Sequence, residues 1–231
     1  QKMLQTKGND IKGKTVTISG SGNVAQFAAE KVLQLGGKVI TLSDSSGYIV
    51  DDNGIDEEKL AYVMDLKNNK RGRISAYVEA YPSARFFAHK TPWGEPCDIA
   101  LPCAAQNELD ESDAKTLLDN GCVCVSEGAN MPSTKEAIVL FQRAKISFAP
   151  GKASNAGGVA TSGLEMTQNS LRYNWTRKEV DDKLKEIMGN IHDKCIKYGK
   201  DEKTGYIDYV KGANIAGFVK VADAMLAQGV V

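Results

Sequence analysis

Two glycines, Gly20 and Gly22, stand between an apolar segment and a segment whose small residues have helical spacing. The apolar segment, residues 15–19, has the composition of a buried strand, and the helical one runs over residues 24–35. Gly20 permits a tight turn, and Gly22 has no side chain to keep an anion from the backbone. The first N–H groups of the helix and its dipole favour a phosphate there. The pattern therefore predicts a phosphate-binding turn formed by Gly20, Ser21, Gly22, Asn23 and Val24.

An acidic residue follows at the distance expected of a dinucleotide site. Ala25 stands at the third position of the glycine pattern, and a second strand-like segment, residues 38–42, leads to Asp44. The interval from Ala25 to Asp44 is close to the roughly 20 residues expected of an acid that bonds the adenosine ribose. The order of strand, glycine turn, helix, strand and acid predicts dinucleotide binding. The alternative is a tight turn with an ordinary surface aspartate.

The bulk composition limits the classes of function and partner. The formal net charge is zero, so no basic field attracts nucleic acid or an anionic membrane. No apolar run reaches the roughly 20 residues of a membrane span, and the first residues carry no secretory signal. Five cysteines without a C-x-x-C pair fit a reducing compartment and buried packing rather than metal ligation. We expect a cytoplasmic protein with no metal site and no nucleic-acid or membrane partner.

The order of elements predicts an α/β fold. Strand-like segments alternate with helical ones as far as residue 149, which indicates a Rossmann-like, doubly wound and mostly parallel sheet with helices on both faces. The carboxyl ends of such strands share one edge, where ligands bind. After Pro150 the pattern becomes helical. We expect the end of a linking helix at 1–12, a dinucleotide-binding domain at 13–200 and a C-terminal helical segment at 201–231.

Polar loops follow the predicted strands and carry several specific motifs. They read LPCAAQNE at 101–108, SEGANMP at 126–132 and APGKASNAGGV at 149–159, with SGLEM at 162–166 and ANIAGF at 213–218. Together with the glycine turn and SDSSG at 43–47, they resemble the hexameric bacterial-type, NADP-dependent glutamate dehydrogenases of the glutamate, leucine, phenylalanine and valine dehydrogenase family. The resemblance covers essentially the whole chain, and the motifs run in the family's order.

The resemblance implies a coenzyme-binding half of a longer enzyme. The family's enzymes carry an N-terminal half with the catalytic lysine and aspartate and most of the hexamer contacts, toward which the C-terminal helices pack. We therefore expect no catalytic residue in this chain. The whole enzyme would form a homo-hexamer and reversibly aminate 2-oxoglutarate with ammonia to L-glutamate. The chain alone would bind coenzyme and catalyse poorly or not at all.

Three asparagines and two helical residues receive roles through the resemblance. Asn107 and Asn130 match residues on the nicotinamide ribose side, and Asn155 matches one near the nicotinamide amide. An amide side chain suits this task because it both donates and accepts hydrogen bonds. Val159 and Ser162 match a wall beside the methylenes of the substrate and a serine that bonds its side-chain carboxylate. The alternatives are a helix cap for Asn155 and a serine that bonds its own helix for Ser162.

The choice between NAD and NADP depends on the surroundings of Asp44. A carboxylate alone favours NAD because it bonds ribose hydroxyls and repels a 2′-phosphate. Ser43, Ser45 and Ser46, however, are neutral phosphate donors, and the resemblance connects such serines and a lysine at the Lys67 position with NADP. The alternative for Lys67, within the basic segment 67–73, is a solvated helix face. We predict NADP as the preferred coenzyme, with NAD also possible.

Two other functions stay open. One is a different amino-acid dehydrogenase of the same family, although Ser162 fits glutamate better than a leucine-type substrate. The other is a non-catalytic dinucleotide-binding module.

Overall fold

The computed structural model describes residues 1–229, and the chain divides into two compact units. The first contains residues 3–151 together with Gln1, and the second runs from Lys152 onward and includes Lys2. This division falls inside the segment 13–200 that we assign to one domain from the sequence. The domain boundaries at 12 and 200 stay a prediction. In the described part of the chain, no helix is both long and apolar enough to span a membrane.

The first unit is built on one sheet of seven strands within the described residues, in the order β4-β3-β2-β1-β5-β6-β7. Neighbours are parallel except at β2–β3 and β3–β4, so the predicted mostly parallel α/β sheet is confirmed. The strands are β1 (Thr15–Ile18), β2 (Lys38–Asp44), β3 (Gly47–Val50), β4 (Arg85–Ala88), β5 (Ile99–Leu101), β6 (Cys124–Ser126) and β7 (Ser147–Ala149).

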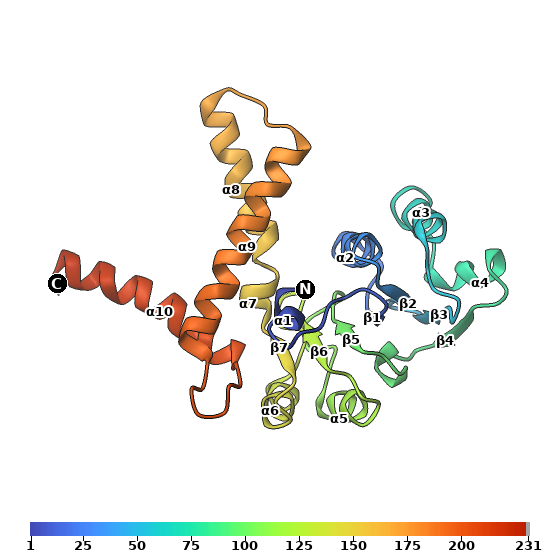
Figure 1. Ribbon diagram of the computed structural model, residues 1–231. Coiled ribbons are helices and arrows are strands. Elements are labelled where there is room, and N and C mark those ends of the chain that lie inside the picture. The colour runs from blue at the N-terminus through green and yellow to red at the C-terminus, as the bar shows by residue number, and fades with distance from the viewer. Residues whose placement is uncertain (230–231) are drawn as a thin grey trace. The chain divides into compact units, whose positions relative to one another are not determined.

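Helices cover both faces of this sheet. In Figure 1, α2 (Asn23–Gln34) and α3 (Glu57–Met64) lie on one face, and α5 (Glu111–Asp119) and α6 (Lys135–Arg143) lie on the other. The core is the apolar layer between helices and sheet; Val16, Ile18 and Leu42 in it have no exposed surface. Strands covered on both faces need apolar residues in succession, as the sequence of β1 provides. Shorter elements are α1 (Lys2–Gln5), the π-helical turn η1 (Asp65–Asn69), the 3₁₀ turns η2 (Ile74–Ala76) and η3 (Pro92–Gly94), and α4 (Tyr77–Ala80).

The strand order reverses at β1. The chain passes from β1 to β2 on one side and later enters the sheet at β5 on the other side of β1. The loops at the carboxyl ends of β1, β2 and β5 therefore diverge around one point of the sheet edge. Doubly wound folds bind their ligands in the crevice at such a switch point.

The second unit is helical, as the sequence predicts. It contains α7 (Gly151–Ser154) from Lys152 onward, α8 (Ala156–Leu171), α9 (Arg177–Gly199) and α10 (Tyr209–Gln228). A reciprocal capping box between Thr176 and Glu179 begins α9. The contact of α9 with α10 requires a glycine, because a Cβ on Gly212 would lie 2.1 Å from the Cys195 carbonyl oxygen.

Candidate functional site

The two glycines of the turn after β1 are accounted for by different structural features. Gly20 has φ +82°, and a Cβ there would lie 2.9 Å from the carbonyl oxygen of Cys103. Gly20 is therefore required by the fold itself. Gly22 has φ −83°, a value open to any residue, and a Cβ there would meet no described atom within 4 Å. Because the protein does not fill the space beside Gly22, that space can hold a ligand.

Helix α2 starts at this open space without a side-chain cap. The caps of the other long helices in the first unit are Asp56, Asp110 and Thr134, each of which accepts a backbone N–H of its helix. The N-cap of α2 is Gly22, and among the described residues no side chain caps the helix there. The first N–H groups of α2 and the positive end of its dipole are thus available to an anion. This geometry fits the predicted phosphate-binding turn.

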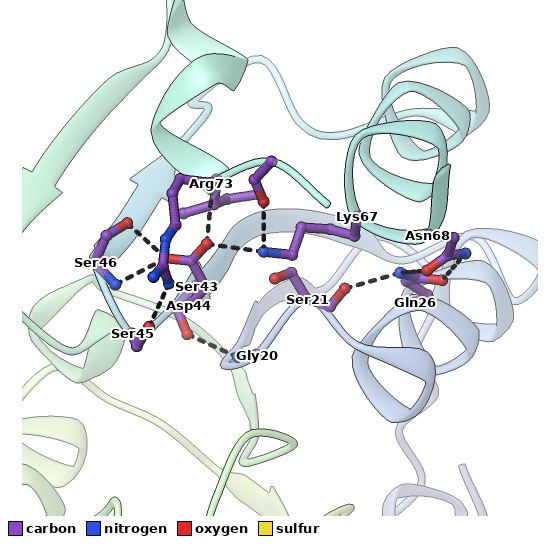
Figure 2. A network of polar contacts seen from close by, with 12 residues as sticks. Gly20, Ser21, Gln26, Ser43, Asp44, Ser45, Ser46, Lys67, Asn68 and Arg73 are labelled. Carbon is purple, nitrogen blue, oxygen red and sulfur yellow. Dashed lines mark hydrogen bonds and ion pairs between the residues drawn. The ribbon is translucent and has the colours of Figure 1, made fainter. Parts of the chain in front are cut away.

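An amide pair formed by the buried Gln26 and the exposed Asn68 supports the turn. Gln26, which has no exposed surface, donates from Nε2 to the Ser21 carbonyl oxygen at 2.8 Å. The side chains of Gln26 and Asn68 also exchange two hydrogen bonds of 3.0 Å, as Figure 2 shows. This pair cannot be predicted from local sequence patterns, because its members are far apart in the chain. A glutamine on the otherwise apolar buried face of α2 was the available signal.

Asp44, at the end of β2, is saturated by donors from its own chain. Its Oδ1 accepts the Ser46 N–H at 2.8 Å and the Ser46 hydroxyl at 2.6 Å. Its Oδ2 accepts the Lys67 ammonium at 2.9 Å and the Ile74 N–H at 2.8 Å. Burial raises the pKa of Asp44, but the bonds from Ser46, Lys67 and Ile74 outweigh this and hold the pKa at about 2. Asp44 is therefore a charged anchor of the local structure (Figure 2).

Lys67 is neutralised by this arrangement. Its Nζ donates to Asp44 and, at 2.9 Å, to the Gly72 carbonyl oxygen, and its side chain is only 19% exposed. Ser43 is also engaged, since its hydroxyl accepts the Gly20 N–H at 2.7 Å. The two residues brace the loop after β2, and a contact of Lys67 with coenzyme stays a prediction.

Arg73 is an accessible cation near the end of β2, and in the sequence it is visible only as a member of a basic segment. Its Nη1 donates to the hydroxyl of Ser45 at 2.6 Å, and both residues are exposed (Figure 2). No carboxylate in residues 1–229 lies within ion-pair distance of its guanidinium. Arg73 thus brings an uncompensated positive charge to the serine loop.

The loops after β5 and β6 are hydrogen-bonded to each other, which brings the predicted residues Asn107 and Asn130 onto adjoining segments. The Asn107 N–H donates to the Met131 carbonyl oxygen at 3.0 Å, and the Leu109 N–H donates to the Pro132 carbonyl oxygen at 3.0 Å. Asn107 has a left-handed backbone with φ +54°, a conformation that asparagine adopts more readily than most residues. Asn107 is exposed at the sheet edge.

A half-buried carboxylate, Glu108, supports the first of these loops. Glu108 accepts the N–H groups of Ala104 and Ala105 at 2.9 and 3.3 Å through Oε1. Burial raises the pKa of Glu108, and hydrogen bonds from Ser19 and the two N–H groups act in the opposite direction. In the sequence, Glu108 is visible only as part of a motif.

The other three predicted residues lie in the second unit. Asn155 is at the N-cap of α8, yet its side chain makes no capping bond, which argues against the cap interpretation. Val159 is 76% exposed. The Ser162 hydroxyl donates to the Gly158 carbonyl oxygen at 3.4 Å, as in the alternative we considered from the sequence. Val159 and Ser162 share an exposed face of α8. Their contacts with coenzyme or substrate stay predictions.

The fold and this edge define the class of the first unit: a Rossmann-type α/β domain with a glycine turn at the switch point. The sequence profile of the glutamate/leucine/phenylalanine/valine dehydrogenases matches residues 1–229. The chain belongs to this family, and the resemblance inferred from the motifs is confirmed.

Relatives and solved structures agree with this assignment. The chain is 62% identical over 229 residues to a glutamate dehydrogenase of Bacteroides thetaiotaomicron, covering 99% of the chain and 51% of that protein. It is 59% identical to an NADP-specific glutamate dehydrogenase of Haemophilus influenzae, covering 100% and 51%. A crystal structure of Plasmodium falciparum glutamate dehydrogenase superimposes with a TM-score of 0.95 at 48% identity, covering 99% of this chain and 49% of that one. The chain spans about half the length of the curated relatives it matches.

Proposed function

We propose that this chain is the coenzyme-binding part of a glutamate dehydrogenase and that it prefers NADP over NAD. The observation that carries the proposal is the open, uncapped start of α2 beside Gly22, with the Ser45–Arg73 pair at the end of the next strand. The N–H groups of α2 would hold the pyrophosphate. The adenosine ribose would then reach the loop after β2.

The preference for NADP follows from the local charges. The NADP-specific relative from Haemophilus influenzae is 59% identical to this chain, and an NAD-specific glutamate dehydrogenase of Bacteroides fragilis is 57% identical. Overall sequence similarity therefore favours neither coenzyme. In this chain the charge of Asp44 is balanced by Lys67 at 2.9 Å, which weakens its repulsion of a 2′-phosphate. Arg73 and the Ser45 hydroxyl add a positive charge and a donor at the same loop, and an arginine fork suits a phosphate.

The other end of the coenzyme would lie over β5 and β6. Asn107 and Asn130 would bond its ribose there, and Asn155 would bond the nicotinamide amide. Val159 and Ser162 would contact the substrate. A bound nicotinamide supplies hydride chemistry, while the protein orients the coenzyme and excludes water. The whole enzyme would aminate 2-oxoglutarate with ammonia as a cytoplasmic homo-hexamer, and its catalytic groups would come from the part of the enzyme outside this chain.

Titration of the chain with NADPH and NADH tests the proposal. Nicotinamide fluorescence would give both dissociation constants, and a turnover assay with 2-oxoglutarate and ammonia would run in parallel. We expect NADPH to bind at least about tenfold tighter than NADH, about 1.4 kcal/mol, without turnover. Binding of neither coenzyme would overturn the proposal, and tighter binding of NADH would overturn the stated preference.

A further inference from the structure

Glu127 places a buried carboxylate directly after β6, in the first unit. The residue is only 3% exposed, and its N–H donates to the Ala149 carbonyl oxygen at 3.2 Å. Oε1 accepts the Ser133 N–H at 3.2 Å, and Oε2 accepts the Gly151 N–H at 2.6 Å. Each oxygen therefore serves a backbone donor. An amide at this place would turn its NH₂ group toward one of these donors, since only one of its two ends accepts.

These two bonds connect two loops of the candidate site. The bond to Ser133 closes the segment 128–132, which carries Asn130, at its base. On its other side the same segment is held by the Gly128 N–H, which donates to the Pro102 carbonyl oxygen at 2.8 Å. The bond to Gly151 extends the support to the segment that follows β7. A single side chain thus fixes the loop after β6 against its neighbour.

The position of this loop relates it to one end of the coenzyme. The glycine turn after β1 would hold the pyrophosphate, and the loop after β2 would hold the adenosine ribose. The rest of a dinucleotide must extend to the opposite side of β1, where β5 and β6 lie. The loop held by Glu127 therefore faces the nicotinamide end and not the adenosine end.

We propose that Glu127 is a positioning residue for the nicotinamide end of the coenzyme. The inference rests on the proposed function. Glu127 acts through the loop of Asn130, because its own oxygens are buried and occupied by backbone donors. A loop already fixed in its binding conformation loses less entropy when the ligand binds. Loosening it lowers affinity only for ligands that reach it.

The test compares a complete coenzyme with one that lacks nicotinamide. Calorimetry would measure the binding of NADPH and of 2′-phospho-ADP-ribose to the parent chain, to Glu127→Gln and to Asp98→Asn. The control, Asp98, is a carboxylate that also binds a backbone donor, the Thr15 N–H at 2.9 Å, but it does so at the opposite edge of the sheet. We expect Glu127→Gln to raise the dissociation constant of NADPH by at least about tenfold and to change that of 2′-phospho-ADP-ribose by less than about twofold. Asp98→Asn should change neither dissociation constant.

Equal weakening of both ligands in Glu127→Gln, or weakening of neither, would overturn the positioning role. A parent chain that binds neither ligand would instead overturn the proposed function. Amide exchange on the parent chain needs no substitution and decides the matter if Glu127→Gln does not fold. NADPH should slow exchange at the Ser133 and Gly151 N–H groups more than 2′-phospho-ADP-ribose does. Equal slowing by the two ligands would refute the inference.

Discussion

Replacement of Gly22 by aspartate should separate stability from coenzyme binding, with opposite signs. The backbone of Gly22, at φ −83° and ψ −171°, accommodates an ordinary residue, and the added Cβ meets no described atom within 4 Å. Aspartate at an N-cap is better than glycine by a few tenths of a kcal/mol and also interacts with the helix dipole. We expect Gly22→Asp to raise the free energy of unfolding by about 0.5–1 kcal/mol.

The same carboxylate would stand where a pyrophosphate is proposed to bind. Two like charges about 4 Å apart repel by roughly 4 kcal/mol at an effective dielectric constant near 20. Allowing for solvent and relaxation, NADPH should bind at least about a hundredfold more weakly, which corresponds to about 2.7 kcal/mol. Gly22→Asn is the matched control, since it has nearly the same shape and no charge. It should retain the part of the stability gain that comes from capping the helix, and it should lose less affinity for NADPH.

Urea unfolding and NADPH titration on the three proteins would check this reasoning. Gly20→Ala is the contrasting variant. Because position 20 has φ +82° and a Cβ there would lie 2.9 Å from the Cys103 carbonyl oxygen, this substitution should lower the free energy of unfolding by about 1–3 kcal/mol. A Gly22→Asp protein that binds NADPH as tightly as its parent would refute the assignment of the phosphate site. Unfolding of Gly22→Asp would refute the claim that the space beside Gly22 is open.

Three further results are expected. In parallel titrations, Arg73→Ala should weaken the binding of NADPH about tenfold or more and leave the binding of NADH unchanged. Lys67→Ala should mainly lower stability, since it leaves Asp44 without its cation. Equal losses of NADPH affinity in the two variants would contradict this division. The pKa of Asp44 is depressed to about 2, so its contribution to stability is complete above the ordinary carboxyl pKa near 4 and is lost as the pH falls toward 2. The free energies of unfolding of the parent and Asp44→Asn, measured in urea, should differ by about 1–2 kcal/mol at pH 6 and converge near pH 2. A difference that does not change with pH would contradict this assignment. Gly212→Ala should cost at least about 2 kcal/mol in thermal unfolding because its Cβ would overlap the Cys195 carbonyl oxygen, and an unchanged melting temperature would show that α10 can move away from α9.

The sequence was sufficient for the parts of the site that depend on local order. The turn at Gly20 and Gly22, the helix after it and the acid at the end of β2 are neighbours along the chain, and their periodicity and spacing predict them. The alternation of strands and helices likewise predicts the sheet.

The roles of the charged side chains depended on contacts between distant segments. The π-helical turn Asp65–Asn69 directs Lys67 to Asp44 and Asn68 to Gln26, and no spacing rule anticipates such a turn. The exposure of Arg73 follows from the path of the chain after that turn. The sequence shows Glu127 only as one residue of a motif. Its role could not be predicted, because its partners are the backbone N–H groups of Ser133 and Gly151.

If the proposed function holds, the separation of a part-buried Asp44–Lys67 pair from an exposed Ser45–Arg73 pair bears on how coenzyme preference diverges among relatives. The part-buried pair holds the loop, and the exposed pair lies on its rim, so under the proposed function a substitution at the rim would change ligand affinity with little penalty to folding. Selection would then change the preference through one or two surface positions and keep the scaffold intact. Relatives named NADP-specific, NAD-specific and NAD(P)-specific, all 57–62% identical to this chain, are what such evolutionary lability would produce.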